Sequence, residues 1–248
     1  MKKVGAILVS FLSVLLLVAC SQQSASKKSD SSSSQTSASS EVKKTTASSS
    51  EVKEKEKKEK EKYKQKMLET GVDFSKPVIA FSIYSRVAHK IYPIDKMKEV
   101  VKFLINRYSA QIIFFYSADQ KDEIQKIHKE IGDFKNIFSS IETPTIKDLV
   151  PFLENCDYYI GNEGGARHLA QGVGIPTLAI FSPSADLKEW LPFPSEKNMG
   201  ISPIDMLEKN TLSLDDFNKM NPEEQFSLID IETIKEMSDE LIEKNKRK

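Results

Sequence analysis

Short apolar runs alternate with segments of helical periodicity between residues 78 and 181, and this alternation constrains the fold most strongly. Runs with the length and content of buried strands cover 78–84, 111–116, 136–141, 157–160 and 176–181. Helical spacing of apolar residues separates them over 94–108, 118–131, 145–156 and 166–173. Strands joined by helices in this way pair in parallel. We therefore predict an α/β fold with a single doubly wound parallel sheet.

The segment after the last predicted strand differs from the alternating region. A Pro-rich stretch carrying Trp190 comes first, followed by a helix that begins near Ser213 and a final amphipathic helix over 231–242. We expect these C-terminal helices to pack back onto the sheet.

The first 20 residues have the pattern of an export signal. Lys2 and Lys3 precede an apolar stretch over 4–19, which is shorter than the roughly 20 residues that a membrane span needs. The stretch ends in Leu-Val-Ala-Cys, which resembles a bacterial lipobox. Residues 1–20 are therefore predicted to be a lipoprotein signal peptide, with Cys20 as the lipidated residue and the protein on the outer face of the cell membrane. An ordinary apolar region with a chance cysteine is the alternative.

Residues 21–66 lack the apolar content of a folded domain. Nearly half of residues 21–50 are serine, and residues 51–66 alternate Glu and Lys. We predict a disordered tether, whose second part could also form a solvent-exposed helix or stiff spacer. The folded domain is then expected over 73–248.

Charge and cysteine content exclude several function classes. Lys and Arg equal Asp and Glu at 36 each, but the basic excess lies before residue 67 and the acidic excess after it. An acidic body argues against nucleic-acid binding by the folded part. Two cysteines, Cys20 and Cys156, cannot form a disulfide framework or a cysteine-based zinc site.

The loop after the fourth predicted strand is the strongest candidate for a binding site. Ligands of open parallel sheets bind at the carboxyl ends of the strands, and this loop reads Gly-Asn-Glu-Gly-Gly-Ala-Arg-His over 161–168. Its backbone N–H groups and the following helix dipole can hold an anion such as phosphate, with His168 in the first turn. Plain turn chemistry explains the glycines equally well on these grounds alone.

The stretch over 156–193 resembles the donor-binding signature of glycosyltransferase family 9, the heptosyltransferase family. The loop over 85–93, with Lys90 before an aromatic residue and a proline, is similar to the family's loop after the first strand of that domain. Residues 200–205 and 224–229 also resemble it, so the similarity covers about 73–245.

The resemblance implies a Rossmann-like domain equivalent to the C-terminal half of a GT-B glycosyltransferase, which binds a nucleotide-sugar without a metal or other cofactor. It implies leaving-group stabilisation by Lys90 and His168. The donor-binding residues carried over are Lys90, Asn162, Glu163, Gly164, Gly165 and His168. The commoner family motif has Asp-Thr-Gly where this chain has Glu163, Gly164 and Gly165.

Other candidates carry weaker signals. Asp119 and Glu123 lie where the family often has a carboxylate near the nucleoside, although an exposed helix face explains them better. Arg167 could reach phosphate or be exposed, and Trp190 matches a family aromatic that could also be a packing or lid residue. Cys156 is predicted to be a buried small hydrophobe, and the isolated histidines His89 and His128 are predicted to be surface residues.

The sequence leaves two functions open, with a third ranked last. The first is a membrane-anchored lipoprotein that binds a nucleotide-sugar and, with a partner that supplies the acceptor domain and catalytic base, transfers the sugar to a cell-envelope glycan. The second is a non-catalytic surface lipoprotein that uses the domain to bind a glycan or a protein. The third is the solute-binding lipoprotein of a transporter, for which a body of this length is small.

Overall fold

The computed structural model describes residues 38–132 and 134–246. The strands are β1 (Val78–Ser82), β2 (Gln111–Phe114), β3 (Ile137–Phe138), β4 (Tyr158–Asn162), β5 (Thr177–Ile180) and β6 (Asn198–Ile201). The α-helices are α1 (Ala38–Glu69), α2 (Ile94–Tyr108), α3 (Lys121–Ile131), α4 (Ile146–Leu153), α5 (Gly165–Gly172), α6 (Leu187–Trp190), α7 (Leu214–Phe217), α8 (Pro222–Ser227) and α9 (Ile231–Lys244). Three 3-10 helices are η1 (Ala88–Lys90), η2 (Ala118–Gln120) and η3 (Pro203–Met206).

The strands form one parallel sheet in the order β3-β2-β1-β4-β5-β6. The order reverses at β1, so the loops after β1 and β4 leave the sheet side by side at its carboxyl edge. The predicted α/β doubly wound fold is confirmed. The prediction missed β6, which is an edge strand with three partly exposed residues and no continuous apolar run.

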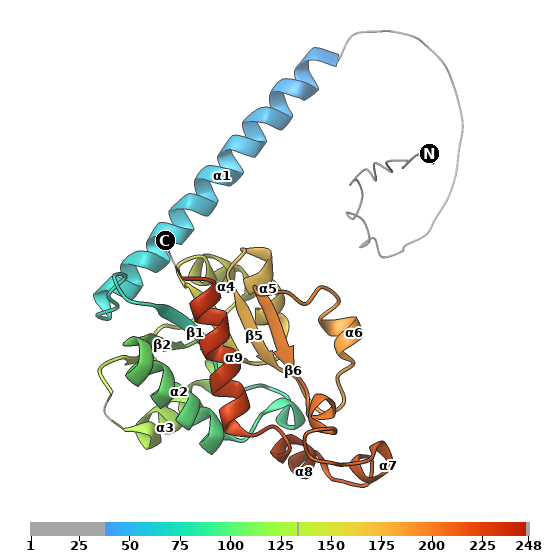
Figure 1. Cartoon of the computed structure of the whole chain (residues 1–248). Helices are drawn as coiled ribbons and strands as arrows, with labels where there is room; N and C mark the ends of the chain where they lie inside the picture. Colours follow the sequence, from blue (N-terminus) through green and yellow to red (C-terminus); the bar gives the residue numbers. More distant parts are fainter. Residues whose placement is uncertain (1–37, 133, 247–248) are drawn as a thin grey trace, which may run out of the picture. The chain divides into compact units, whose positions relative to one another are not determined.

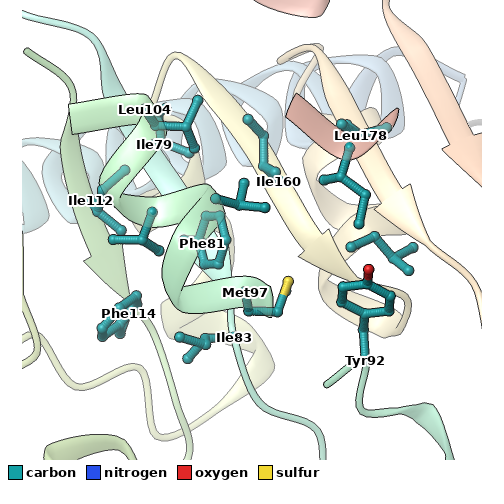
Figure 2. Close-up of a cluster of buried hydrophobic side chains, with 14 of the residues drawn as sticks. Ile79, Phe81, Ile83, Tyr92, Met97, Leu104, Ile112, Phe114, Ile160 and Leu178 are labelled. Carbon is teal, nitrogen blue, oxygen red and sulfur yellow. The ribbon is translucent and has the colours of Figure 1, made fainter. Parts of the chain in front are cut away.

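One face of the sheet, here the first face, is covered by α2, α3 and α9. Side chains alternate along a strand, so Ile79 and Phe81 of β1 point to this face. Figure 2 shows them beside Met97 and Leu104 of α2, and Figure 1 shows α9 and α2 in front of the strands. The apolar stripe predicted for residues 94–108 is the buried side of α2.

The opposite face, here the second face, is covered by α4, α5 and the end of α1. Val78 and Ala80 of β1 contribute to a separate apolar cluster on this side, together with Phe152 of α4. Tyr63 and Met67 of α1 belong to the same cluster, and their side chains are 1% and 0% exposed.

The structure therefore corrects the predicted boundary between tether and domain. Residues 38–69 form one helix, so the helical alternative for residues 51–66 describes this segment and disorder does not. The helix is not an exposed spacer throughout, because Tyr63 and Met67 lie four residues apart on one side and both are buried. The core of the domain begins at Tyr63 rather than at residue 73. The predicted signal peptide and Cys20 lie outside the described residues.

The close approach of β1 and β4 depends on a glycine. Gly161 pairs with Ser82 and has a φ of +136°, which L-residues with side chains rarely adopt. A Cβ atom at Gly161 would lie 2.4 Å from the backbone oxygen of Ser82. The absence of a side chain at this position lets the two strands carry their loops into one site.

Candidate functional site

A cleft of about 470 Å³ opens at the carboxyl edge of the sheet. Its walls come from the loops that follow β1, β2, β3 and β4. They include Tyr84, Ser85, Arg86, Val87, Lys90, Phe115, Tyr116, Ser117, Gln120, Thr143, Pro144, Thr145, Ile146, Leu149, Glu163, Gly164, Gly165 and Ala166. One part of the cleft is therefore lined by aromatic and apolar side chains, and another by cations and a glycine turn.

Lys90 and Glu163 form an ion pair at the polar part of the cleft. Lys90 ends η1, and its Nζ donates to Oε2 of Glu163 at 3.2 Å. Oε1 of Glu163 accepts the backbone N–H of Ser182 at 3.0 Å, and the Glu163 side chain is only 4% exposed against 30% for Lys90. Glu163 is predicted to bind the donor, but both of its carboxylate oxygens are already engaged by Lys90 and Ser182.

Asn162 supports the cleft from below and does not face it. The residue is fully buried, with Oδ1 accepting the Tyr92 N–H at 2.9 Å and Nδ2 donating to the Ser82 oxygen at 3.0 Å. Tyr92 is fixed further by its hydroxyl, which donates to the Ile229 oxygen at 2.6 Å. The placement of Asn162 among donor-contacting residues is therefore corrected. Its amide ties β4 to the end of the loop that carries Lys90.

Gly164 and Gly165 bring the start of α5 to the cleft. The first N–H groups of a helix have no acceptor within the helix, and they point outward with the positive end of its dipole. Gly164 has a φ of +156° and Gly165 begins α5, with no heavy atom within 4 Å of a Cβ built at either position. A threonine at 164, as in the commoner family motif, would be strained by this φ although the space is free.

His168 lies on the exposed side of α5, outside the lining of the cleft. Its ring centroid is 5.9 Å from that of Trp190, whose ring is in turn 5.9 Å from the Lys90 Nζ. Nη2 of Arg167 lies 3.2 and 3.3 Å from the two ring nitrogens of His168. Lys90 and His168 are thus brought to the same end of the site with the Trp190 ring near both.

The surroundings of His168 favour its neutral form. Partial burial and the positive charge of Arg167 lower the pKa of the imidazole, and the Glu163 carboxylate opposes this with a smaller effect. A neutral imidazole can donate one hydrogen bond and accept another. An approaching anion would counteract the influence of Arg167 and favour the protonated form.

The structure also locates the weaker candidates. Asp119 is exposed and pairs with Arg86 at 3.3 Å, and Glu123 pairs with Lys126 within α3 at 3.6 Å, as expected for a solvated surface. The prediction that Cys156 is a buried small hydrophobe is confirmed by its 4% exposure. Arg167 is neither exposed nor at the cleft, since it is 1% exposed and not among the lining residues.

The isolated histidines differ from each other. His89 is exposed, as predicted. His128 is only partly exposed, because its Nδ1 lies 2.6 Å from the Ser139 hydroxyl and its ring packs edge-on against Phe114. Trp190 is partly exposed at 45%, which agrees better with a lid than with a core residue.

Sequence reasoning missed the wall formed by the loops after β2 and β3. Phe115 and Tyr116 directly follow β2, and Thr143, Ile146 and Leu149 lie between β3 and the body of α4. Their position after the carboxyl ends of strands is the signal that could have identified them. Within the described ranges, histidine, cysteine and carboxylate side chains form no group of three suited to a metal ion. No helix of the described chain combines the length and apolarity needed to cross a membrane.

Comparison with known proteins yields a family match and a curated relative. The sequence profile of glycosyltransferase family 9 (heptosyltransferase) matches residues 23–213. Lipopolysaccharide heptosyltransferase 1 of Campylobacter coli is 28% identical over 132 residues, which are 52% of this chain and 39% of that protein. The chain therefore spans well under half of that relative.

Solved structures support the fold. The glycosyl transferase family 9 protein from Veillonella parvula DSM 2008 superposes with a TM-score of 0.60 at 16% identity, over 75% of this chain and 52% of that one. The E. coli ADP-heptose lps heptosyltransferase II gives a TM-score of 0.55 at 18% identity, over 76% and 52%. The chain spans about half the length of each of these structures.

Proposed function

The chain belongs to glycosyltransferase family 9, and from that premise we propose that the cleft beside Lys90 binds a nucleotide-sugar donor. One observation carries the proposal: a lysine and the N-terminus of α5 meet at one part of a cleft whose remaining lining includes several aromatic and apolar side chains. The cationic part suits a diphosphate, and the apolar part suits a planar base. The similarity to the E. coli ADP-heptose lps heptosyltransferase II makes ADP-heptose the first donor to test.

Lys90 is the residue best placed to contact the diphosphate. Its Nζ has three donors and is 3.2 Å from Glu163, so one ammonium group can keep the carboxylate and still donate to a phosphate oxygen. The N–H groups at the start of α5 would contact the same anion from the other side. Donors arranged around a departing diphosphate stabilise the charge that develops on it as the glycosidic bond breaks.

His168 is the second residue proposed for leaving-group stabilisation. Its ring stands beside Trp190 and lies outside the lining of the cleft, so it would contact only the end of the diphosphate nearest the Trp190 ring. A neutral imidazole there can donate one hydrogen bond to a phosphate oxygen. None of these contacts requires a metal ion, and we propose a metal-independent site.

The transfer itself requires an acceptor and a base. Glu163 is the buried carboxylate at the polar end of the cleft, and both of its oxygens are engaged, by Ser182 and by Lys90. A general base must reach the acceptor hydroxyl within hydrogen-bond distance. We therefore propose that a partner supplies the acceptor-binding domain and the base, and that the acceptor is a cell-envelope glycan presented to a protein anchored through Cys20.

A second function is favoured by the same engaged carboxylate. If Glu163 serves only to hold Lys90, the domain is a binding module for an anionic glycan or a protein segment and not an enzyme. This alternative predicts that the domain binds its ligand but transfers no sugar to any cell-envelope glycan that is added as an acceptor.

Calorimetric titration of the full chain with ADP, UDP and ADP-heptose tests donor binding. Lys90→Ala should weaken the binding of the preferred nucleotide by about 10- to 100-fold, because a hydrogen bond to a charged group contributes about 1.5–3 kcal/mol. His168→Ala should weaken it less. Lys102→Ala is the matched control, since Lys102 is a lysine of α2 whose side chain is 37% exposed and that pairs only with Glu99 among the contacts described.

Absence of heat with every nucleotide, in protein that unfolds cooperatively, would overturn the donor-binding proposal. If Lys90→Ala binds the preferred nucleotide as strongly as the wild type does, the diphosphate does not contact Lys90. The anchor is tested separately by comparing the wild type with Cys20→Ser in cells fed labelled palmitate, where only the wild type should carry label and sediment with membranes.

A further inference from the structure

Arg167 is the largest of the fully buried side chains in the part of the chain whose burial the structure describes, and its position is unusual for an arginine. The residue is 1% exposed and lies in the first turn of α5, with its guanidinium carbon 5.3 Å from the centre of the Phe181 ring. Arginine stays charged under all ordinary conditions, so α5 places a positive charge beneath the protein surface next to the cleft.

This charge is incompletely compensated. Nε and Nη1 of Arg167 have no exposed surface and no hydrogen-bond partner among the described residues, and the described salt bridges assign no carboxylate to the guanidinium. Burial of a charged group without full pairing costs stability, as the lowered pKa of Arg167 on burial also indicates. Because burying Arg167 costs stability, the contacts of its third guanidinium nitrogen, Nη2, are the place to look for its role.

Nη2 joins two segments that are far apart in the sequence. It donates to the backbone oxygen of Trp190 at the end of α6, and it lies 3.2 Å from Nδ1 of His168 on α5. The α6 segment is otherwise held by a small cluster of Phe181, Leu187 and Leu191. One guanidinium nitrogen therefore couples the loop after β5 to the helix after β4.

The two residues that Arg167 contacts, Trp190 and His168, lie at the end of the site where Lys90 is found. The Trp190 ring lies 5.9 Å from the His168 ring and 5.9 Å from the Lys90 Nζ. Any change in the Trp190 backbone moves an aromatic ring that stands near Lys90 and His168, the two side chains proposed to hold the diphosphate. The charged groups that influence the His168 ring are Arg167 from α5 and Glu163 from the preceding loop.

We propose that Arg167 is a positioning residue that fastens the Trp190 loop to α5 and thereby sets the places of Trp190 and His168 at the anion end of the cleft. The inference rests on the proposed function for its purpose, because the framed anion is the donor diphosphate. Its geometry is testable without any ligand. Trp190 is the single tryptophan of the chain, so its fluorescence reports on this loop alone.

The test compares Arg167→Met, Arg167→Lys and wild type as full chains, with Arg107→Met, at an exposed arginine near the end of α2, as the matched control. In Arg167→Met we expect Trp190 emission to shift to longer wavelength, acrylamide quenching to increase, and the His168 titration midpoint, measured by NMR, to move upward. Arg167→Lys keeps the positive charge but lacks the guanidinium that donates to the Trp190 oxygen. It should therefore leave the His168 titration midpoint near that of the wild type and still increase the quenching of Trp190. ADP affinity should fall in both variants.

Unchanged quenching and an unchanged His168 midpoint in Arg167→Met would overturn the proposal. Failure of both Arg167 variants to fold would also overturn it, because the residue would then hold the fold and not the site. If wild-type protein binds no nucleotide but the ligand-free signals of Trp190 and His168 change as expected, the proposed function fails while the positioning role stands.

Discussion

The two faces of the sheet are covered in different ways. The first face is closed by α2, α3 and α9, all of which lie beyond β1 in the sequence. The second face is closed by α4 and α5 together with the last turns of α1, a helix whose sequence is mostly Glu and Lys over its second half. A charged helix therefore completes the core of a domain that it precedes. The difference shows that average composition does not define a domain boundary, because two apolar side chains suffice to extend it.

Removal of α1 should have the largest effect. A chain that begins at residue 73 lacks Tyr63, Met67 and Val72, and loss of three buried side chains should lower the free energy of unfolding by about 4–9 kcal/mol relative to a chain that begins at residue 51. Urea denaturation of both chains measures the difference. Equal stabilities would show that the second face does not need α1.

Single truncations on each face come next. Leu104→Ala on the first face and Met67→Ala on the second each remove a fully buried side chain and should each cost about 3 kcal/mol. Thermal and urea unfolding of the two variants gives the comparison directly. A cost below about 0.5 kcal/mol for Met67→Ala, as for a surface position, would contradict the docking of α1.

The polar contact between α1 and α4 should contribute less. The Tyr63 hydroxyl donates to Oδ1 of Asp148 at 2.9 Å, so Tyr63→Phe should cost about 1 kcal/mol. A double-mutant cycle with Asp148→Asn isolates the pairwise part. Strict additivity of the two substitutions would show that this hydrogen bond does not join the helices.

The smallest effect concerns pH. Hydrogen bonds from Thr145 and Tyr63 lower the pKa of Asp148 below its ordinary value, so its folded pKa lies below its unfolded one. The resulting stabilisation is present above the unfolded pKa and is lost as the pH falls below about 4. The stability of Asp148→Asn should therefore decline less steeply than that of the wild type in acid. Parallel declines would assign the acid sensitivity to other carboxylates.

Strands that are buried on both faces can be predicted from the sequence, and the partly exposed edge strand cannot. Strands β1, β2, β4 and β5 lie within two residues of their predicted bounds, because strands covered on both faces are continuous apolar runs. Strand β6 has no such run. The docking of α1 escapes prediction because Tyr63 and Met67 are isolated in a charged repeat.

The site divides in the same way. The glycine turn and Lys90 can be identified from their place after strands, and both line the cleft. The orientations of three other side chains cannot be predicted, because each depends on a partner that is distant in the sequence. Glu163 contacts Ser182, Asn162 contacts Tyr92, and Arg167 contacts Trp190. The sequence pattern identifies residues that could bind a ligand, and tertiary contacts determine the orientation of their side chains.

The glycine at position 161 also bears on how this domain can evolve. Any side chain there would collide with the Ser82 oxygen and separate β1 from β4, so the spacing between the two loops of the site is fixed by a position that contacts no ligand. A Cβ atom at Gly165, by contrast, would meet open space. Descendants of this sequence are free to explore new ligands through substitution at 165, while position 161 keeps the same residue whatever the ligand becomes.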